Sequence, residues 1–184
     1  VAGDASALSV AFTAPSGTVT KYQFSTDNGS NWSDATGASS PITLTGLAAN
    51  TSYTQLKIRA VSAAGNGVAS AAFSGTTVPG APASIAVTAG SETSSSLALT
   101  FTAPTGSVTI TGYEYQVDGG SWTALTAGEI TAGGFTVTGL SSNVSHTVAL
   151  RASNASGTGA STSTVSGLTL PAAPSALAVA PVDG

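Results

Sequence analysis

Residues 47–67 read LAANTSYTQLKIRAVSAAGNG, and residues 140–159 read LSSNVSHTVALRASNASGTG. Each stretch passes from a leucine to a ring-bearing residue, continues through alternating polar and apolar residues, and ends in a glycine-containing turn. Alternation at a period of two indicates a β-strand with one buried face. The recurrence of the whole pattern predicts an all-β protein built from a repeated unit.

Further matches extend the repeat over most of the chain. Phe-Thr-Ala-Pro occurs at 12–15 and again at 101–104, and Thr-Gly-Leu occurs at 45–47 and again at 138–140. The separation varies from 89 to 93 residues, and these length differences fall in the expected turns. Because several matches keep the same order, chance does not explain them.

The repeat divides the 184-residue chain into three parts: a first unit at 1–79, a second unit at 80–171, and a linker with the first strand of a third unit at 172–184. The third part is recognised because PAAPSALAV at 171–179 echoes PGAPASIAV at 79–87. Val1 aligns with Val87, so we expect the first unit to lack most of its opening strand.

The strand pattern favours a sandwich. Each unit contains about seven short alternating segments without helical periodicity, which is typical of an immunoglobulin-like β-sandwich. Asn28-Gly29 and Gly119-Gly120 supply the positive φ angles that tight hairpin turns require. The predicted fold class is therefore all-β, with immunoglobulin-like β-sandwiches in tandem.

Residues 47–67 resemble the end of strand E and strand F of a fibronectin type III domain. This resemblance places Leu47 and Tyr53 in that family's tyrosine corner, with Leu140 and His146 in the same positions of the second unit. It implies that the corner phenol bonds back to the chain upstream. The Pro-rich entry segments and the Ala-Pro-x-Gly turns are similar to the bacterial and phage branch of the family.

The sequence departs from the family pattern at two places. Phe12 and Phe101 stand where a tryptophan is usual on strand B, and His146 stands where the second corner tyrosine is expected. These changes concern local stability rather than the fold. For His146 we expect a ring that fills the corner and bonds to a loop carbonyl.

Composition excludes several classes of partner. The net charge is −4, and the 4 Lys and Arg residues are too few to neutralise a nucleic acid or to bind anionic lipid. No apolar run approaches the roughly 18 residues of a membrane span. Cysteine is absent, so no disulfide or thiolate metal site is expected, and no cofactor is implied. Abundant Ser and Thr with 7% charged residues favour an extracellular, cell-surface or virion location.

Trp32 and Trp122 are the candidate ligand or partner contacts, because an exposed indole can stack on a sugar or anchor an interface. Both follow a hairpin turn at the same repeat position. The structural alternative, which we favour, is that each covers one edge of the sandwich at the rim of the core. The other nine aromatic residues are expected to point mostly inward.

Metal and catalytic sites are not expected. Asp27 with its neighbours faintly resembles a calcium loop, but a hairpin turn explains the same residues. Glu114 and Asp118 are interpreted as solvated surface, and Arg59 and Arg151 as outward-facing and solvated or paired. No nucleophile–base pair is evident, so the chain is interpreted as non-catalytic.

A β-bulge is predicted near Thr54-Gln55, because Leu56, Ile58 and Ala60 are one residue out of phase with Tyr53. The second unit has no such shift. Five asparagines begin N-x-S/T sequons whose use depends on the host: Asn28, Asn31, Asn50, Asn143 and Asn154.

Two functions compete. The first is a structural spacer or adhesion module in a tandem array of a bacterial surface protein or phage virion. Its partners would be neighbouring repeats, surface glycans, or other virion or cell-surface proteins. The alternative is a carbohydrate-binding accessory module of a secreted enzyme. For the chain ends, the favoured explanation is a parent chain that continues in both directions, and the other is a tail that completes the first unit of the next copy.

Overall fold

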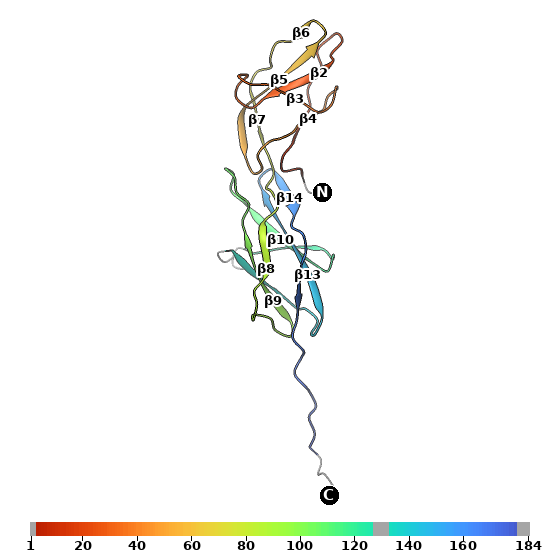
Figure 1. The fold of residues 1–184 in the computed structure, drawn as a ribbon, viewed down its shortest axis with the longest axis vertical. Coiled ribbons are helices and arrows are strands. Elements are labelled where there is room, and N and C mark those ends of the chain that lie inside the picture. The colour runs from red at the N-terminus through yellow and green to blue at the C-terminus, as the bar shows by residue number, and fades with distance from the viewer. Residues whose placement is uncertain (1–2, 127–132, 180–184) are drawn as a thin grey trace.

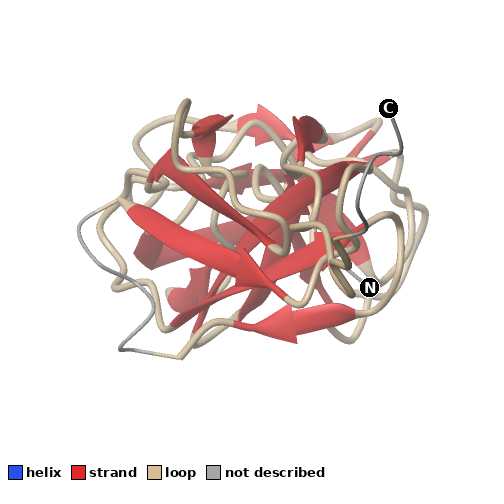
Figure 2. Cartoon of the chain, turned by 90° about the horizontal axis from the view of Figure 1, so that it is seen from below, coloured by secondary structure: helices blue, strands red, loops and turns tan. Residues whose placement is uncertain are grey.

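The computed structural model describes residues 3–126 and 133–179, whose strands form two β-sandwiches placed end to end (Figure 1). These described residues contain strands, turns and loops and no helix (Figure 2). Consequently, nothing in that part of the chain is a helix long and apolar enough to cross a membrane. The predicted all-β fold of tandem immunoglobulin-like β-sandwiches is confirmed.

The first unit contains one two-stranded sheet, β1–β4, and a second sheet ordered β3–β2–β5–β6, in which β7 pairs with another part of β5. All its pairings are antiparallel. The strands are β1 (Leu8–Val10), β2 (Lys21–Ser25), β3 (Ser33–Asp34), β4 (Ile42–Leu44), β5 (Ser52–Ser62), β6 (Gly65–Asn66) and β7 (Phe73–Thr76).

The second unit repeats this plan with one additional strand. Its smaller sheet is ordered β12–β9–β8, and its larger sheet β11–β10–β13–β14 carries β15 on another part of β13. The strands are β8 (Ala83–Val87), β9 (Ser96–Thr102), β10 (Gly112–Val117), β11 (Trp122–Ala124), β12 (Gly134–Thr138), β13 (Ser145–Asn154), β14 (Gly157–Ser161) and β15 (Val165–Leu168).

Each core lies between the two sheets of its unit. Buried and half-buried apolar residues of the strands pack together in these cores, because side chains on one face of a strand recur every second residue. The nine aromatic residues other than tryptophan all belong to these cores or pack against them, which confirms their inward orientation. The largest fully buried core side chains are Ile42, Leu44, Leu56, Leu97, Leu99, Val137, Val148 and Leu150.

The predicted bulge is confirmed. Tyr53 pairs with Gly75 and Leu56 pairs with Phe73, so β5 contains one more residue than β7 across this interval. That extra residue lies in the Thr54-Gln55 segment and restores the inward phase at Leu56, which is fully buried. The matching part of the second unit, 145–148 against 165–168, pairs without a shift.

The units differ in their opening strand. Strand β9 is flanked by β8 and β12, whereas β1 pairs only with β4 among the described residues. Leu97 and Leu99 on β9 are therefore completely covered, while Leu8 on β1 is only half-buried. Val1, which aligns with Val87, lies outside the described residues. Residues 171–179 extend away from the second unit, and each is exposed (Figure 1).

Candidate functional site

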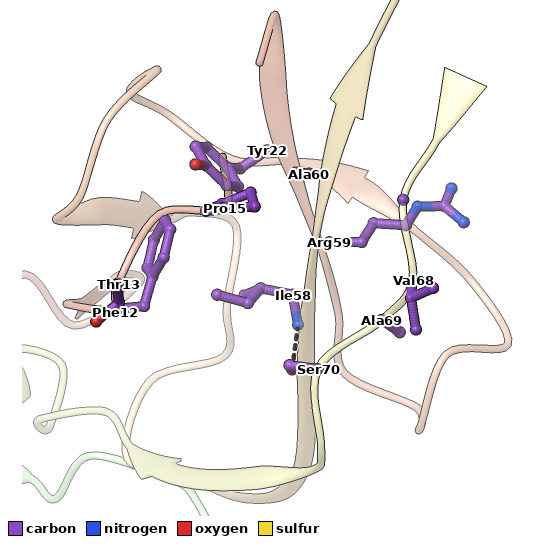
Figure 3. Close-up of a pocket in the computed structure, with 11 residues that line it drawn as sticks. Phe12, Thr13, Pro15, Tyr22, Ile58, Arg59, Ala60, Val68, Ala69 and Ser70 are labelled. Carbon is purple, nitrogen blue, oxygen red and sulfur yellow. Dashed lines mark hydrogen bonds between the residues drawn. The ribbon is translucent and has the colours of Figure 1, made fainter. Parts of the chain in front are cut away.

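Trp32 lies on the outer face of the larger sheet of the first unit. On the neighbouring strands, Gln23 and Arg59 pair directly and point away from the core, since the flanking Tyr22 and Phe24 are buried. Figure 3 shows the Arg59 side chain on the opposite side of β5 from Ile58. The Arg59 guanidinium carbon lies 4.2 Å from the centre of the Trp32 ring, a cation–π stack.

Hydrogen bonds hold this stack in place. The Nε and Nη2 atoms of Arg59 donate to Gln23 Oε1 at 2.9 and 2.6 Å. The Gln23 amide in turn donates to Asp34, which also pairs with Lys21 at 2.9 Å. The hydrogen bond from Lys21, followed by that from Gln23, lowers the pKa of Asp34. The half-buried indole therefore stacks on one end of a row of hydrogen-bonded polar side chains, which runs through Arg59, Gln23, Asp34 and Lys21.

The second unit repeats the stack. The Arg151 guanidinium carbon lies 4.1 Å from the Trp122 ring centre, and its Nε donates to Glu114 at 2.8 Å. Arg59 and Arg151 are therefore paired, one of the two states expected for them. Glu114, interpreted as solvated surface, is instead an ion-pair partner.

Neither tryptophan is among the residues of the core clusters, and each half-buried indole stacks on an arginine of the outer sheet face. The physical reason is the long arginine side chain opposite each indole, which provides a favourable stacking partner on the outer face. Each guanidinium also covers part of the aromatic surface that a sugar ring would need. Contact of Trp32 and Trp122 with a ligand remains a prediction.

The corner of the first unit joins two loops to the core. Leu47 is buried, and its backbone N–H donates to Ser6 at 2.9 Å. The Tyr53 hydroxyl accepts a hydrogen bond of 2.7 Å from the Ala48 N–H, five residues upstream. The phenol therefore acts as an acceptor toward an amide.

His146 occupies the same corner in the second unit beside the half-buried Leu140. Its Nε2 atom lies 3.1 Å from the Ser141 carbonyl, and its Nδ1 atom lies 2.7 Å from an Asp118 carboxylate oxygen. Hydrogen bonds to Asp118 and then to Ser141 raise the pKa of His146, because both acceptors favour the imidazolium. Asp118 also accepts from the Thr147 N–H, which is the main cause of its lowered pKa.

Asp27 organises a hairpin turn. Its carboxylate accepts from the Asn31 N–H and side chain and from the Ser25 hydroxyl, and these bonds lower its pKa to about 2. The adjacent Asn28 and Gly29 have φ angles of 61° and 98°. The described residues contain no group of three or more His, Cys, Asp or Glu side chains that could hold a metal ion.

A buried asparagine joins the two units. Asn50 is 1% exposed, and its backbone carbonyl accepts hydrogen bonds from the N–H groups of Ser107 and Val108 at 2.9 and 3.1 Å. Its side-chain amide donates to the Val108 carbonyl at 2.7 Å. From the second unit, Asn154 donates to the Asn50 side-chain oxygen at 3.0 Å and to the Thr77 carbonyl at 2.9 Å.

Two glycines permit this close approach. A Cβ atom at Gly106 would overlap the Asn50 carbonyl oxygen, and one at Gly159 would overlap the Pro79 carbonyl oxygen. Asn50 itself has a φ of 48°, a left-handed conformation that asparagine adopts more readily than most residues. We call this set the junction: Asn50, Thr77, Gly106, Ser107, Val108 and Asn154.

Sequence reasoning did not find the junction. In the sequence, Asn50 and Asn154 were identified only as the first residues of sequons. Both are buried in the structure, which excludes them from glycosylation in the folded protein. The sequence does contain one signal of the special backbone at Asn50, because Asn143 stands at the same place in the second unit. In the structure Asn143 has a φ of 54°. An asparagine at the same place in both units is consistent with a required backbone conformation.

This chain is similar in sequence or in structure to parts of several known proteins. No family model matches it. Chitinase A1 of Niallia circulans is 36% identical over 166 residues, which cover 83% of this chain and 22% of that protein. The two-domain fibronectin type III segment of chicken tenascin aligns with 92% of this chain and 95% of its own, at 19% identity and a TM-score of 0.46. A human fibronectin type III domain aligns with 55% of this chain and 96% of its own, at 24% identity and a TM-score of 0.45.

Proposed function

We propose that the chain is a non-catalytic spacer in an extracellular multidomain protein, holding the parts on either side of it at a set distance and angle. The observation that carries this proposal is the junction, in which a buried asparagine of each unit bonds to the other unit. Sandwich units joined by a flexible linker would not need such contacts.

The energetics of burial explain why the junction would resist bending. Domains in one chain are expected to move relative to each other unless their interface is large or specific. Hinging at this point would break the hydrogen bonds that Asn50 and Asn154 make across the junction. Each lost hydrogen bond costs about 0.5–1.5 kcal/mol, which opposes the motion.

The similarity to chitinase A1 suggests one kind of parent protein. Because this chain matches 22% of chitinase A1, one proposed setting is an accessory region within a longer enzyme. The same spacer role would serve a bacterial surface protein or a phage tail fibre. The junction supports the spacer role in each of these settings.

Residual dipolar couplings test the spacer role directly. In the natural sequence, one alignment tensor should describe both units, because they tumble as one body. Asn50→Ala should give two different tensors and faster local tumbling of each unit. Asn143→Ala is the matched control, since Asn143 has the same left-handed backbone but lies at the far end of the second unit. Independent tensors in the unmodified protein would overturn the proposal.

A carbohydrate-binding accessory role is the second candidate, favoured by the recurrence of a half-buried tryptophan on the same sheet face of both units. Titration with chitin oligosaccharides, followed by NMR, tests it. The indole N–H signals of Trp32 and Trp122 should shift if the role is correct, and Trp32→Ala with Trp122→Ala should abolish the shifts. Unchanged indole signals at saturating oligosaccharide would exclude this role for these sugars.

A further inference from the structure

Most of the positive charge of this acidic protein lies on one sheet face of the first unit. The chain has 4 Lys and Arg residues against 8 Asp and Glu residues. Three of the four cations belong to strands β2 and β5: Lys21, Lys57 and Arg59. Lys57 and Arg59 flank Ile58, which packs on the core, so both point to the outer face. Lys21 lies on the same face as Gln23, two residues along β2.

Two of these three cations have no acidic partner within residues 3–126 and 133–179. Lys21 pairs with Asp34, whereas Lys57 and Arg59 form no ion pair there. A guanidinium has five N–H donors, and Arg59 uses two of them on Gln23, so three remain. Acids outnumber cations in this chain, yet two neighbouring cations stay uncompensated by any direct contact.

The side chains around Trp32 are held in position. Trp32 Nε1 donates to the Gly29 carbonyl at 2.9 Å, which fixes the plane of the indole. Arg59 stacks on this ring while Gln23 holds its Nε and Nη2 atoms. A Cβ atom at Gly29 would lie 3.5 Å from the Trp32 ring and 3.8 Å from Lys57 Cδ, so the indole and the Lys57 stem meet at the same turn. We call this set the Trp32 patch: Gln23, Trp32, Lys57 and Arg59.

The second unit provides a natural comparison. It repeats the stack of a guanidinium on an indole, but Glu114 stands at the place of Gln23 and pairs with Arg151. Ala149 stands at the place of Lys57. The two faces therefore share the stack and differ in charge, because the arginine of the second unit is compensated and the lysine is absent.

We propose that the Trp32 patch binds a uronic acid chain, a polysaccharide whose sugar rings carry carboxylates. The proposal rests on the carbohydrate-binding role, the second candidate function, and narrows it to acidic sugars and to the first unit. The free N–H donors of Arg59 pair with one carboxylate. Lys57, two residues along the same strand and so roughly 7 Å away, pairs with another. The part of the indole that Arg59 leaves uncovered contacts the apolar face of a sugar ring.

The small number of free cations favours an acidic sugar chain over other anionic ligands. Two cations on a protein of net charge −4 cannot neutralise a nucleic acid, in which every nucleotide carries a phosphate. An acidic peptide would make the same charge contacts but would lose more conformational freedom on binding than a chain of stiff sugar rings. A sugar ring also uses the indole, which a glutamate side chain does not.

NMR titration of the complete chain with a galacturonic acid trimer tests the proposal. The indole signal of Trp32 and the Nε–H signal of Arg59 should shift, and those of Trp122 and Arg151 should not. The methyl ester of the same trimer is the uncharged matched probe, and it should bind at least about tenfold more weakly because charge-assisted hydrogen bonds are lost. An amidated glutamate trimer carries the same number of carboxylates without sugar rings and should also bind more weakly.

Three substitutions that each lower the net charge by one locate the site. Lys57→Gln removes one free cation, and Gln23→Glu gives Arg59 the partner that Arg151 has. Both should weaken binding of the acid trimer by about tenfold or more. Thr123→Glu, at an exposed position on β11 of the second unit, is the control and should leave the affinity unchanged.

The proposal is overturned by equal shifts of the two indole signals, by equal binding of the methyl ester or the glutamate peptide, or by unchanged affinity in both first-unit variants. If chitin oligosaccharides move the indole signals and the acid trimer does not, the carbohydrate-binding role stands and only its restriction to acidic sugars fails. If neither ligand moves them, both fail. Because the spacer proposal rests on the junction, it does not depend on this outcome.

Discussion

At the residue scale, His146 and Asp118 make the stability of the second unit depend on pH. The raised pKa of His146 means that its contribution to stability is fully present below its ordinary value of 6.5 and is lost as the pH rises through the folded value. The lowered pKa of Asp118 means that its contribution is present above 3.8 and is lost as the pH falls through the folded value. Between pH 3.8 and pH 6.5, both His146 and Asp118 therefore contribute to the stability of the second unit.

We therefore expect the second unit to unfold at a lower temperature at about pH 9 than at about pH 6, because the imidazolium is lost over this interval. His146→Tyr restores the residue of the first unit and should remove the dependence, and Asp118→Asn should reduce it. NMR thermal melts report each unit separately, with the first unit as an internal reference. Equal melting of the second unit at both pH values would contradict the role given to the Asp118 pair.

Tyr53 gives a second prediction at this scale. The partner of its hydroxyl is the N–H of the exposed Ala48, which water can also reach after the hydroxyl is removed. Tyr53→Phe should therefore lower the free energy of unfolding of the first unit by about 1 kcal/mol, the net value of one hydrogen bond. Urea unfolding measures this change. A loss several times larger would mean that the phenol has a further structural role.

At the scale of elements, alternation and turn chemistry were sufficient to predict the strands and the bulge. Leu56, Ile58 and Ala60 are one residue out of phase with Tyr53, and one extra residue in the strand returns them to the buried face. The arginine–tryptophan stacks were not predictable, because strand periodicity does not say which neighbouring strand supplies a partner. The outward position of Arg59 was evident, but its contact with Trp32 depends on the pairing of three strands.

Strand β1 differs from β9 in having one partner in place of two among the described residues. Backbone amides of residues 8–12 should therefore exchange with solvent faster than those of residues 97–101, since an unpaired edge leaves donors open to water. Hydrogen exchange followed by NMR gives both rates in one experiment. Equal protection of the two strands would show that β1 is covered by another means.

At the scale of the whole molecule, the repeat predicted two units in series but not how they meet. The junction combines residues far apart in the sequence, and Asn50 and Asn154 belong to different units. Nothing in either local pattern indicates that these side chains are buried against each other. The close packing at Gly106 likewise depends on a residue of the other unit, since its neighbour is the carbonyl of Asn50.

Gly106 therefore allows the end-to-end geometry to be tested without removing a hydrogen-bonding side chain. Gly106→Ala places a Cβ where the Asn50 carbonyl oxygen lies, so the units must separate or rotate. Gly17→Ala is the matched control, because Gly17 is the repeat counterpart, also has a positive φ, and has open space within 4 Å of the position that a Cβ would occupy. Both variants impose a backbone cost on their own unit, but only Gly106→Ala disturbs the junction. Small-angle scattering of dilute protein should show a changed maximum dimension for Gly106→Ala and an unchanged one for Gly17→Ala. If the two variants scatter alike, the contact at Asn50 does not set the angle between the units.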